Sequence, residues 1–242
     1  MSKVVCIIQA RMGSTRLPGK VMEDICGKPM LQHVIERCKR AHTVQEVVVA
    51  TTNKHSDSPI HNLCDDINIE CYVVGMSVSA EGDVLGRYYH TARCLAADVI
   101  VRVTGDCPLV DPSIIDECVR RHIAADGAYT RTPDGYPKGA DVEVFGIGEL
   151  GDANDIEAYT KCSIYGKHCR EHVTPSMYDH LPRYDITQRL CVDYQEDLDV
   201  VREVFHAHGP ANTFTLSEAC VWLNANPMIA AINQGVAGDD VR

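Results

Sequence analysis

Apolar residues along the chain recur in short β-rich runs, and these runs alternate with helical patterns. The runs occupy Val4 to Gln9, Glu46 to Thr51, Glu70 to Val74, Asp98 to Val103 and Asp141 to Phe145. Between the first four runs and after the fourth, the pattern predicts helices at about Met30 to Ala41, Pro59 to Asp65, Asp83 to Ala96 and Ser113 to Ala125. Strands that alternate with helices build a mostly parallel sheet covered by helices. The pattern therefore predicts an α/β fold.

The second half of the chain is less regular. Residues 126 to 140 are rich in Gly, Pro and other turn formers, which predicts a long loop or a small lobe. Later patterns predict a strand near residues 188 to 192 and helices around residues 157 to 169, 171 to 179, 196 to 206, 216 to 223 and 227 to 233. A chain of 242 residues can bury one full core. We expect one domain over residues 1 to 242, with an irregular lobe at about 126 to 182.

Composition and charge narrow the classes of function. No apolar run approaches the roughly 20 residues that cross a bilayer, and no signal-peptide pattern opens the chain, so we expect a cytoplasmic protein. The 12 cysteines lack zinc-type spacing, and we assign them no chemistry. A net charge of −11 argues against nucleic acid or an anionic membrane as partner. Residues 1 to 40, however, carry eight Lys/Arg and three Asp/Glu, which predicts a small anionic ligand near this basic segment.

The segment from Gln9 to Lys20, directly after the first predicted strand, holds the densest chemistry. It contains Gly13, Gly19, two hydroxyl residues and three cations, namely Arg11, Arg16 and Lys20. Open α/β sheets bind ligands at the carboxyl ends of their strands, and these donors suit a polyphosphate. It is not a Walker A loop, because five residues separate the glycines and Val21 replaces the required Ser/Thr. The alternative is a basic loop that faces solvent.

Carboxylates follow two other predicted strands. Asp106 stands beside a glycine at the end of the fourth strand, where one or two carboxylates commonly hold Mg²⁺ on phosphates. An Asp that caps the turn before Pro108 is the alternative. Strand alternation in the Asp-Val-Glu-Val-Phe run places Asp141 and Glu143 on one face of their strand. They could equally be edge carboxylates that face solvent.

The segment from Gln9 to Val21, together with Gly27-Lys28-Pro29-Met30, resembles the signature of cytidylyltransferases that make CMP-sugar acids such as CMP-Kdo and CMP-acylneuraminate. The most similar branch is that of spore coat polysaccharide biosynthesis protein F. The resemblance continues through Asn226 to Asn233, so it covers nearly the whole chain. It implies a Rossmann-like nucleotidyltransferase fold with a small dimerisation lobe, CTP as donor, Mg²⁺ as cofactor and usually a homodimer.

The same resemblance implies roles for residues of the first loop. Arg11 and Lys20 match residues that hold the triphosphate in related nucleotidyltransferases, and the backbone around Ala10 to Gly13 would meet the cytosine and ribose. The expected catalytic residues are Arg11, Lys20 and Asp106. The expected nucleotide-binding residues are Ala10, Arg11, Met12, Gly13, Ser14, Arg16, Lys20 and Asp106.

Metal and acceptor residues also follow from the resemblance. The family's metal aspartate matches Asp106, and the first Asp of its Val-Asp-Thr-Pro-Glu-Asp motif matches Asp193, which would complete the metal site. Tyr194 and Gln195 depart from that motif, and a helix N-cap is the competing role for Asp193. The resemblance places Asp141 and Glu143 near the acceptor. His172 corresponds loosely to a histidine near the sugar acid, with a helix-start or dimer role as the alternative.

The expected function is transfer of CMP from CTP to a small acidic acceptor, a sugar acid, with release of pyrophosphate. One alternative keeps CTP but uses a phosphonate or a phosphorylated acceptor. A second is a sugar-1-phosphate nucleotidyltransferase, although the usual paired glycines are missing from Arg11 to Arg16. A third is a catalytically silent nucleotide-binding module, against which Lys20 and Asp106 argue. We also expect that Asp106→Asn removes most turnover and can raise stability, since a carboxylate among acidic groups is repelled.

Overall fold

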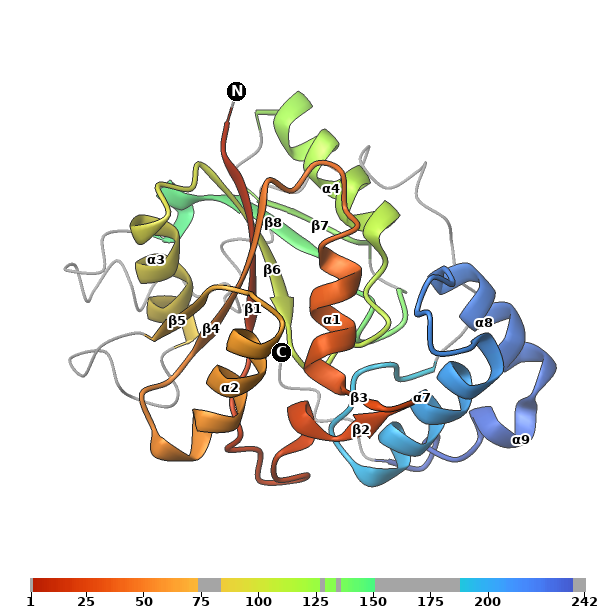
Figure 1. Ribbon diagram of the computed structural model, residues 1–242. Helices are drawn as coiled ribbons and strands as arrows, with labels where there is room; N and C mark the ends of the chain where they lie inside the picture. The colour runs from red at the N-terminus through yellow and green to blue at the C-terminus, as the bar shows by residue number, and fades with distance from the viewer. Residues whose placement is uncertain (1, 74–83, 127–128, 134–135, 151–187, 237–242) are drawn as a thin grey trace.

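A six-stranded sheet organises the fold in the computed structural model, with helices on both faces (Figure 1). The structure describes residues 2–73, 84–126, 129–133, 136–150 and 188–236. The strand order is β5-β4-β1-β6-β8-β7, in which β5, β4, β1 and β6 run parallel and the last two pairings are antiparallel. The strands are β1 (Val4–Gln9), β4 (Glu46–Thr51), β5 (Cys71–Val73), β6 (Val99–Thr104), β7 (Tyr129–Arg131) and β8 (Glu143–Gly146).

Two apolar cores lie on the two faces of this sheet. The larger core joins the sheet to helices α1 (Met30–Cys38), α2 (Ser58–Asp66) and α4 (Pro112–Ala124). The smaller core joins the other face to α3 (Val84–Cys94). Because β1 and β6 are covered on both faces, their sequences read as nearly continuous apolar runs rather than as an alternation.

The C-terminal helices extend the larger core beyond the sheet. Helices α7 (Gln195–His208) and α8 (Leu216–Ala225) bury apolar side chains in it, and the short α9 (Pro227–Ala230) follows. Helix α8 begins with a capping box, in which Thr215 and Glu218 satisfy each other's backbone amides. The remaining short elements are η1 (Lys20–Met22), β2 (Asp24–Ile25), β3 (Lys28–Pro29), η2 (His55–Asp57) and η4 (Ile147–Leu150). No helix in the described part of the chain is long and apolar enough to cross a membrane.

Arg37 joins α1 to the segments that precede α4 and α8. Its guanidinium is fully buried and donates to the carbonyl of Val110 (2.6 Å), to Oδ1 of Asn212 (2.8 Å) and to the carbonyl of Phe214 (2.9 Å). It also lies 4.8 Å from the centre of the Phe214 ring. Burial lowers the pKa of Arg37 to about 10. This cation thus stabilises a tertiary contact between segments far apart in the sequence.

The α/β prediction is confirmed, and its first four strands and four helices all form. Two predictions in the second half are wrong. The segment predicted as loop at residues 126 to 140 contains β7, and the predicted strand near residues 188 to 192 is reduced to an isolated bridge between Lys138 and Arg189. The helices predicted at 157 to 169 and 171 to 179, and most of the expected lobe, lie outside the described residues.

Candidate active site

A cavity of about 540 Å³ opens at the carboxyl ends of β1 and β6. Open α/β folds bind their ligands at this end of the strands. A larger cavity of about 720 Å³ lies at the opposite end of the strands, beside the start of β4, and none of the predicted site residues lines it. The first cavity is lined by Gln9, Ala10, Arg11, Ser14, Thr15, Arg16, Lys20, Val21, Val84, Arg102, Thr104, Gly105, Asp106 and Asp193.

The loop after β1 is folded back on itself so that Lys20 points into this cavity. The carbonyl of Met12 accepts hydrogen bonds from the amides of Ser14 (2.9 Å) and Gly19 (3.0 Å). Gly19 has φ of 74°, a left-handed conformation that residues with a side chain rarely adopt. Helix η1 begins directly after it, at Lys20, whose side chain is buried. The glycine therefore serves the turn that presents the lysine.

The Lys20 ammonium lies between two carboxylates from distant parts of the chain. Its Nζ is 2.6 Å from Oδ2 of Asp106, 2.9 Å from Oδ1 of Asp193 and 2.7 Å from the carbonyl of Val192. The exposed fraction of Lys20 is only 8% and that of Asp193 only 2%. These ion pairs are consequently screened little by solvent.

Burial and charge act in opposite directions on this cluster. Burial by itself would lower the pKa of Lys20, but the charges of Asp106 and Asp193 outweigh it and raise that pKa above its ordinary value. For Asp193, burial would raise the pKa, but the charge of Lys20 outweighs it and holds the pKa of this carboxyl below its ordinary value. Lys20 and Asp193 are therefore both charged at neutral pH.

The two carboxylates fit a Mg²⁺ site of the kind that also uses phosphate oxygens. Their oxygens converge on one point, at which the structure already places a cation, the Lys20 ammonium. No group of three or more metal-ligating side chains occurs among the described residues. Mg²⁺ is commonly bound through one or two carboxylates together with water and substrate phosphates, so two aspartates suffice.

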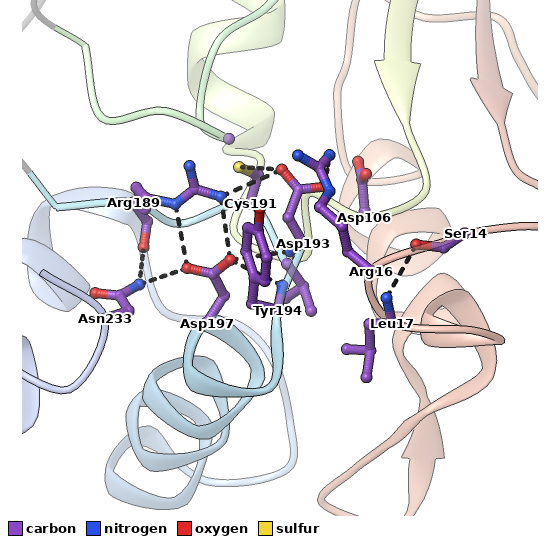
Figure 2. Close-up of polar contacts among 12 residues, drawn as sticks. Ser14, Arg16, Leu17, Asp106, Arg189, Cys191, Asp193, Tyr194, Asp197 and Asn233 are labelled. Carbon is purple, nitrogen blue, oxygen red and sulfur yellow. Dashed lines mark hydrogen bonds and ion pairs between the residues drawn. The ribbon is translucent and has the colours of Figure 1, made fainter. Parts of the chain in front are cut away.

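Two arginines bind the Asp193 carboxylate from either side of the Tyr194 ring (Figure 2). Arg16 Nη2 lies 3.0 Å from Oδ1, and Arg189 Nη2 lies 3.2 Å from Oδ2. The two guanidinium carbons lie 5.2 Å (Arg16) and 5.8 Å (Arg189) from the centre of the ring. Tyr194, which departs from the family motif, thus stacks between the two cations that hold the predicted metal ligand.

A second, fully buried aspartate fixes the backbone that carries Asp193. Asp197 lies in the first turn of α7 and accepts hydrogen bonds from the amides of Asp193 (3.0 Å) and Tyr194 (3.1 Å). It also accepts from both Arg189 and Asn233, as Figure 2 shows. The helix start therefore orients the carboxylate through its backbone.

The segment that leads to Asp193 is supported by a close backbone contact with Lys138 and Gly139. The carbonyl of Lys138 accepts from the amides of Leu190 (2.6 Å) and Cys191 (3.0 Å). Gly139 has φ of 96°, and a Cβ at this position would lie 2.2 Å from the Cys191 nitrogen. Only glycine lets the two backbones approach this closely.

The predicted site residues fall into three groups. Ala10, Arg11, Ser14, Arg16, Lys20, Asp106 and Asp193 line the cavity, whereas Met12 and Gly13 are absent from its lining. Met12 instead donates its amide to Asp57 (2.8 Å). The predicted acceptor residues are not in the lining either: the Asp141 carboxylate accepts from the Gly139 amide, and Glu143 pairs with Arg102. His172 lies outside the described residues.

Sequence reasoning missed Arg102, Thr104, Arg189 and Asp197. A signal existed for the first two, because Arg102 and Thr104 are polar residues at alternate positions of a strand that is otherwise apolar. Arg189 and Asp197 act through contacts with Asp193, and no spacing rule in the sequence reports such contacts.

Comparisons with known proteins find related sequences and a related structure. A family model described as Cytidylyltransferase matches residues 5–214. Spore coat polysaccharide biosynthesis protein SpsF of Bacillus subtilis is 29% identical, over 94% of this chain and 96% of that protein. A 3-deoxy-manno-octulosonate cytidylyltransferase of Trichlorobacter lovleyi is 39% identical over 52% of this chain and 47% of that protein. Among solved structures, a cytidylyltransferase of Leptospira borgpetersenii is 27% identical, with a TM-score of 0.83 over 98% of this chain and 100% of that one.

Proposed function

Because the chain belongs to the cytidylyltransferase family, we propose that this nucleotidyltransferase moves CMP from CTP to a small acidic acceptor, a sugar acid, and releases pyrophosphate. The observation that carries the proposal is the cavity in which Arg11, Arg16 and Lys20 meet Asp106 and Asp193. Three cations on one loop suit a triphosphate, and two convergent carboxylates suit the metal that accompanies it.

In the proposed reaction an acceptor oxygen attacks the α-phosphorus in line, and the bond to pyrophosphate breaks on the opposite side. Negative charge then grows on the departing pyrophosphate. Arg11, Arg16 and Lys20 would bind these oxygens and stabilise that charge. Such a transfer needs no covalent intermediate on the protein, so positioning and electrostatics supply the acceleration.

Substrate binding would exchange partners within the ion cluster. Lys20 and Arg16 now hold the carboxylates of Asp106 and Asp193, and they would turn to the phosphates when CTP enters. The two aspartates would then hold Mg²⁺. When bound there, Mg²⁺ supplies a positive charge that polarises the phosphates. The exchange implies that nucleotide and metal bind more tightly together than either does alone.

A sugar acid is the acceptor class that the relatives favour. The relative from Trichlorobacter lovleyi is named for transfer to 3-deoxy-manno-octulosonate, a sugar acid, and SpsF for polysaccharide biosynthesis. On the same resemblance we propose that the enzyme acts as a homodimer in the cytoplasm. Light scattering at micromolar concentration tests the dimer, and a monomeric mass would contradict it.

Thermal unfolding with each of the four NTPs, with and without Mg²⁺, tests the donor. We expect CTP with Mg²⁺ to stabilise the protein most, by about 2.7 kcal/mol at a hundredfold excess over Kd. Pyrophosphate release with a panel of sugar acids, phosphonates and sugar phosphates tests the acceptor class. Equal stabilisation by all four nucleotides, or release only with a sugar 1-phosphate, would contradict the proposal.

A further inference from the structure

The face of the sheet that packs on α3 changes from apolar to polar partway along its central strands. On β6 the side chains on this face pass from Ile100, in the core, to Arg102, and on β8 the corresponding pair is Phe145 and Glu143. The polar pair lies at the end of the sheet where the cavity opens. Charged side chains in the middle of a covered sheet are costly unless a partner or a ligand compensates them.

Arg102 is held rigidly in this position. Its exposed fraction is 6%, its Nη1 lies 2.8 Å from Oε2 of Glu143, and its guanidinium carbon lies 5.9 Å from the centre of the Tyr88 ring. The Tyr88 hydroxyl in turn donates to the carbonyl of Val103 (2.9 Å). Glu143 and Tyr88 therefore fix a guanidinium that also lines the cavity.

Arg102 and the loop cations reach the cavity from different walls. Arg11, Arg16 and Lys20 come from the loop after β1, whereas Arg102 stands on β6, two residues before Thr104 and on the side of Glu143 in β8. If the loop cations take the triphosphate, as in the proposed function, Arg102 remains as a further guanidinium of the cavity lining, with Glu143 as its ion-pair partner. A guanidinium with a fixed plane is the side chain best matched to a carboxylate, which it can bind through two parallel hydrogen bonds.

We propose that Arg102, oriented by Glu143, binds the carboxylate of the acceptor and makes the enzyme specific for acids. The proposal rests on the proposed function and adds a specificity-determining residue to it. It also gives Glu143 an indirect role. The sequence predicted that Glu143 lies near the acceptor, whereas in this proposal Glu143 positions Arg102 and Arg102 binds the acceptor.

The test compares free acids with their methyl esters, because esterification removes the carboxylate charge and leaves the rest of the molecule in place. The wild-type enzyme is saturated with CTP and Mg²⁺, and pyrophosphate release is followed with Kdo, N-acetylneuraminate and the methyl ester of each. We expect Arg102→Gln to raise the KM for the free acid on the order of tenfold to a hundredfold and to abolish the preference for acid over ester. Arg102→Lys should keep part of that preference.

Two further variants separate acceptor recognition from folding and from nucleotide binding. Glu143→Gln keeps Arg102 but weakens its orientation, and it should raise the acceptor KM by a smaller factor. Arg120→Gln removes the same charge from an exposed position on α4, and it should change nothing. All four variants should keep the thermal stabilisation by CTP with Mg²⁺.

The outcomes distinguish this proposal from the proposed function. If CTP does not stabilise the wild-type protein, the donor assignment fails. If CTP stabilises it and the wild-type enzyme prefers no free acid over its ester, acceptor recognition through a carboxylate is overturned. If the preference exists but survives in Arg102→Gln, the pair with Glu143 is only structural.

Discussion

Two buried cations, Arg37 in the core and Lys20 in the cavity, are held in opposite ways. The Arg37 guanidinium donates its hydrogen bonds to uncharged oxygens of the backbone and of Asn212, and burial outweighs the charge of Asp111 and lowers the pKa of Arg37 to about 10. Lys20 is surrounded by two carboxylates, whose charges raise its pKa despite the burial. Both side chains are nearly inaccessible to solvent, so burial alone does not distinguish a structural cation from a functional one.

The difference lies in whether the partners can accept another cation. The backbone carbonyls that Arg37 binds come from the two segments before α4 and α8, and loss of the guanidinium there would only break this tertiary contact. Carboxylates that line a cavity can pass from an ammonium to a metal ion while the ammonium passes to a phosphate. The kind of partner therefore separates a cation that fixes the fold from one that is available to a substrate.

The largest expected effect comes from Asp106, on the exchangeable side of this comparison. Asp106→Asn preserves size but removes a carboxylate from the proposed metal site, so turnover should fall at least about 10²–10³-fold in a pyrophosphate-release assay. Asp66→Asn, an exposed substitution on α2, is the control. Near-normal turnover of the Asp106 variant would show that this carboxylate is only a turn cap.

The structure corrects one part of that prediction. The expectation that Asp106→Asn stabilises the protein assumed a carboxylate among other acidic groups. Asp106 instead pairs with Lys20 at 2.6 Å, so the substitution should lower the free energy of unfolding modestly.

Arg37 should show the reverse pattern, with a large loss of stability and little effect on the site. Arg37→Met leaves the carbonyls of Val110 and Phe214 and the Asn212 side chain without their buried donor, which should lower the free energy of unfolding by about 3 kcal/mol. Urea unfolding measures the loss, with Arg120→Met as the exposed control. An altered KM for CTP in the folded fraction would mean that the two regions are coupled.

Substitution of Asn233 tests whether the hydrogen bonds around Asp197 support the position of Asp193. Its amide donates to Asp197 (2.8 Å) and to the Arg189 carbonyl (3.0 Å), so Asn233→Ala should lower stability by about 1–2 kcal/mol. If the network positions the metal ligand, the Mg²⁺ concentration for half-maximal activity should also rise several-fold. A loss of stability with unchanged Mg²⁺ dependence would leave Asn233 a purely structural role.

The smallest effect is a difference in pH dependence between the two regions. Burial lowers the pKa of His33, in the Arg37 region, so the unfolded chain binds its proton more readily and stability should fall as pH drops below about 6.5. The slope for one such group is at most about 1.4 kcal/mol per pH unit.

Lys20 and Asp193 should not contribute to that slope. The raised pKa of Lys20 keeps its stabilisation complete below about pH 10, and the lowered pKa of Asp193 keeps its own complete above about pH 4. The assignment of the slope to His33 is checked by measuring the free energy of unfolding of the wild type and of His33→Gln between pH 5 and 8. If stability depends on pH equally in both proteins, the assignment to His33 is refuted.

Features that depend on contacts between residues close in the sequence were predicted better than features that depend on contacts between distant residues. Strand β1 and its loop are local patterns: the bounds of β1 were predicted correctly, and the three cations of the loop line the cavity. Strand β7 has only three residues among turn formers, too few to show a period of two.

The partners within the site were harder to predict than its members. Lys20 and Asp106 were both identified, but as a phosphate ligand and a metal ligand, because no local pattern reports a pairing across 86 positions. The same limit hid the pairing of Arg102 with Glu143, which lies in a strand 41 positions away.

The parts of the site are widely separated along the chain. Strands β1, β4 and β6 and the loop cations all lie at or before Thr104, whereas Asp193 and its support at Asn233 lie in the segment that carries the later helices. Domains generally fold as units. The Lys20 cluster can therefore form only once the chain contains both the loop after β1 and the segment that carries Asp193 and its support, so the ion pairs of the site report on the folding of the whole domain rather than of its first half.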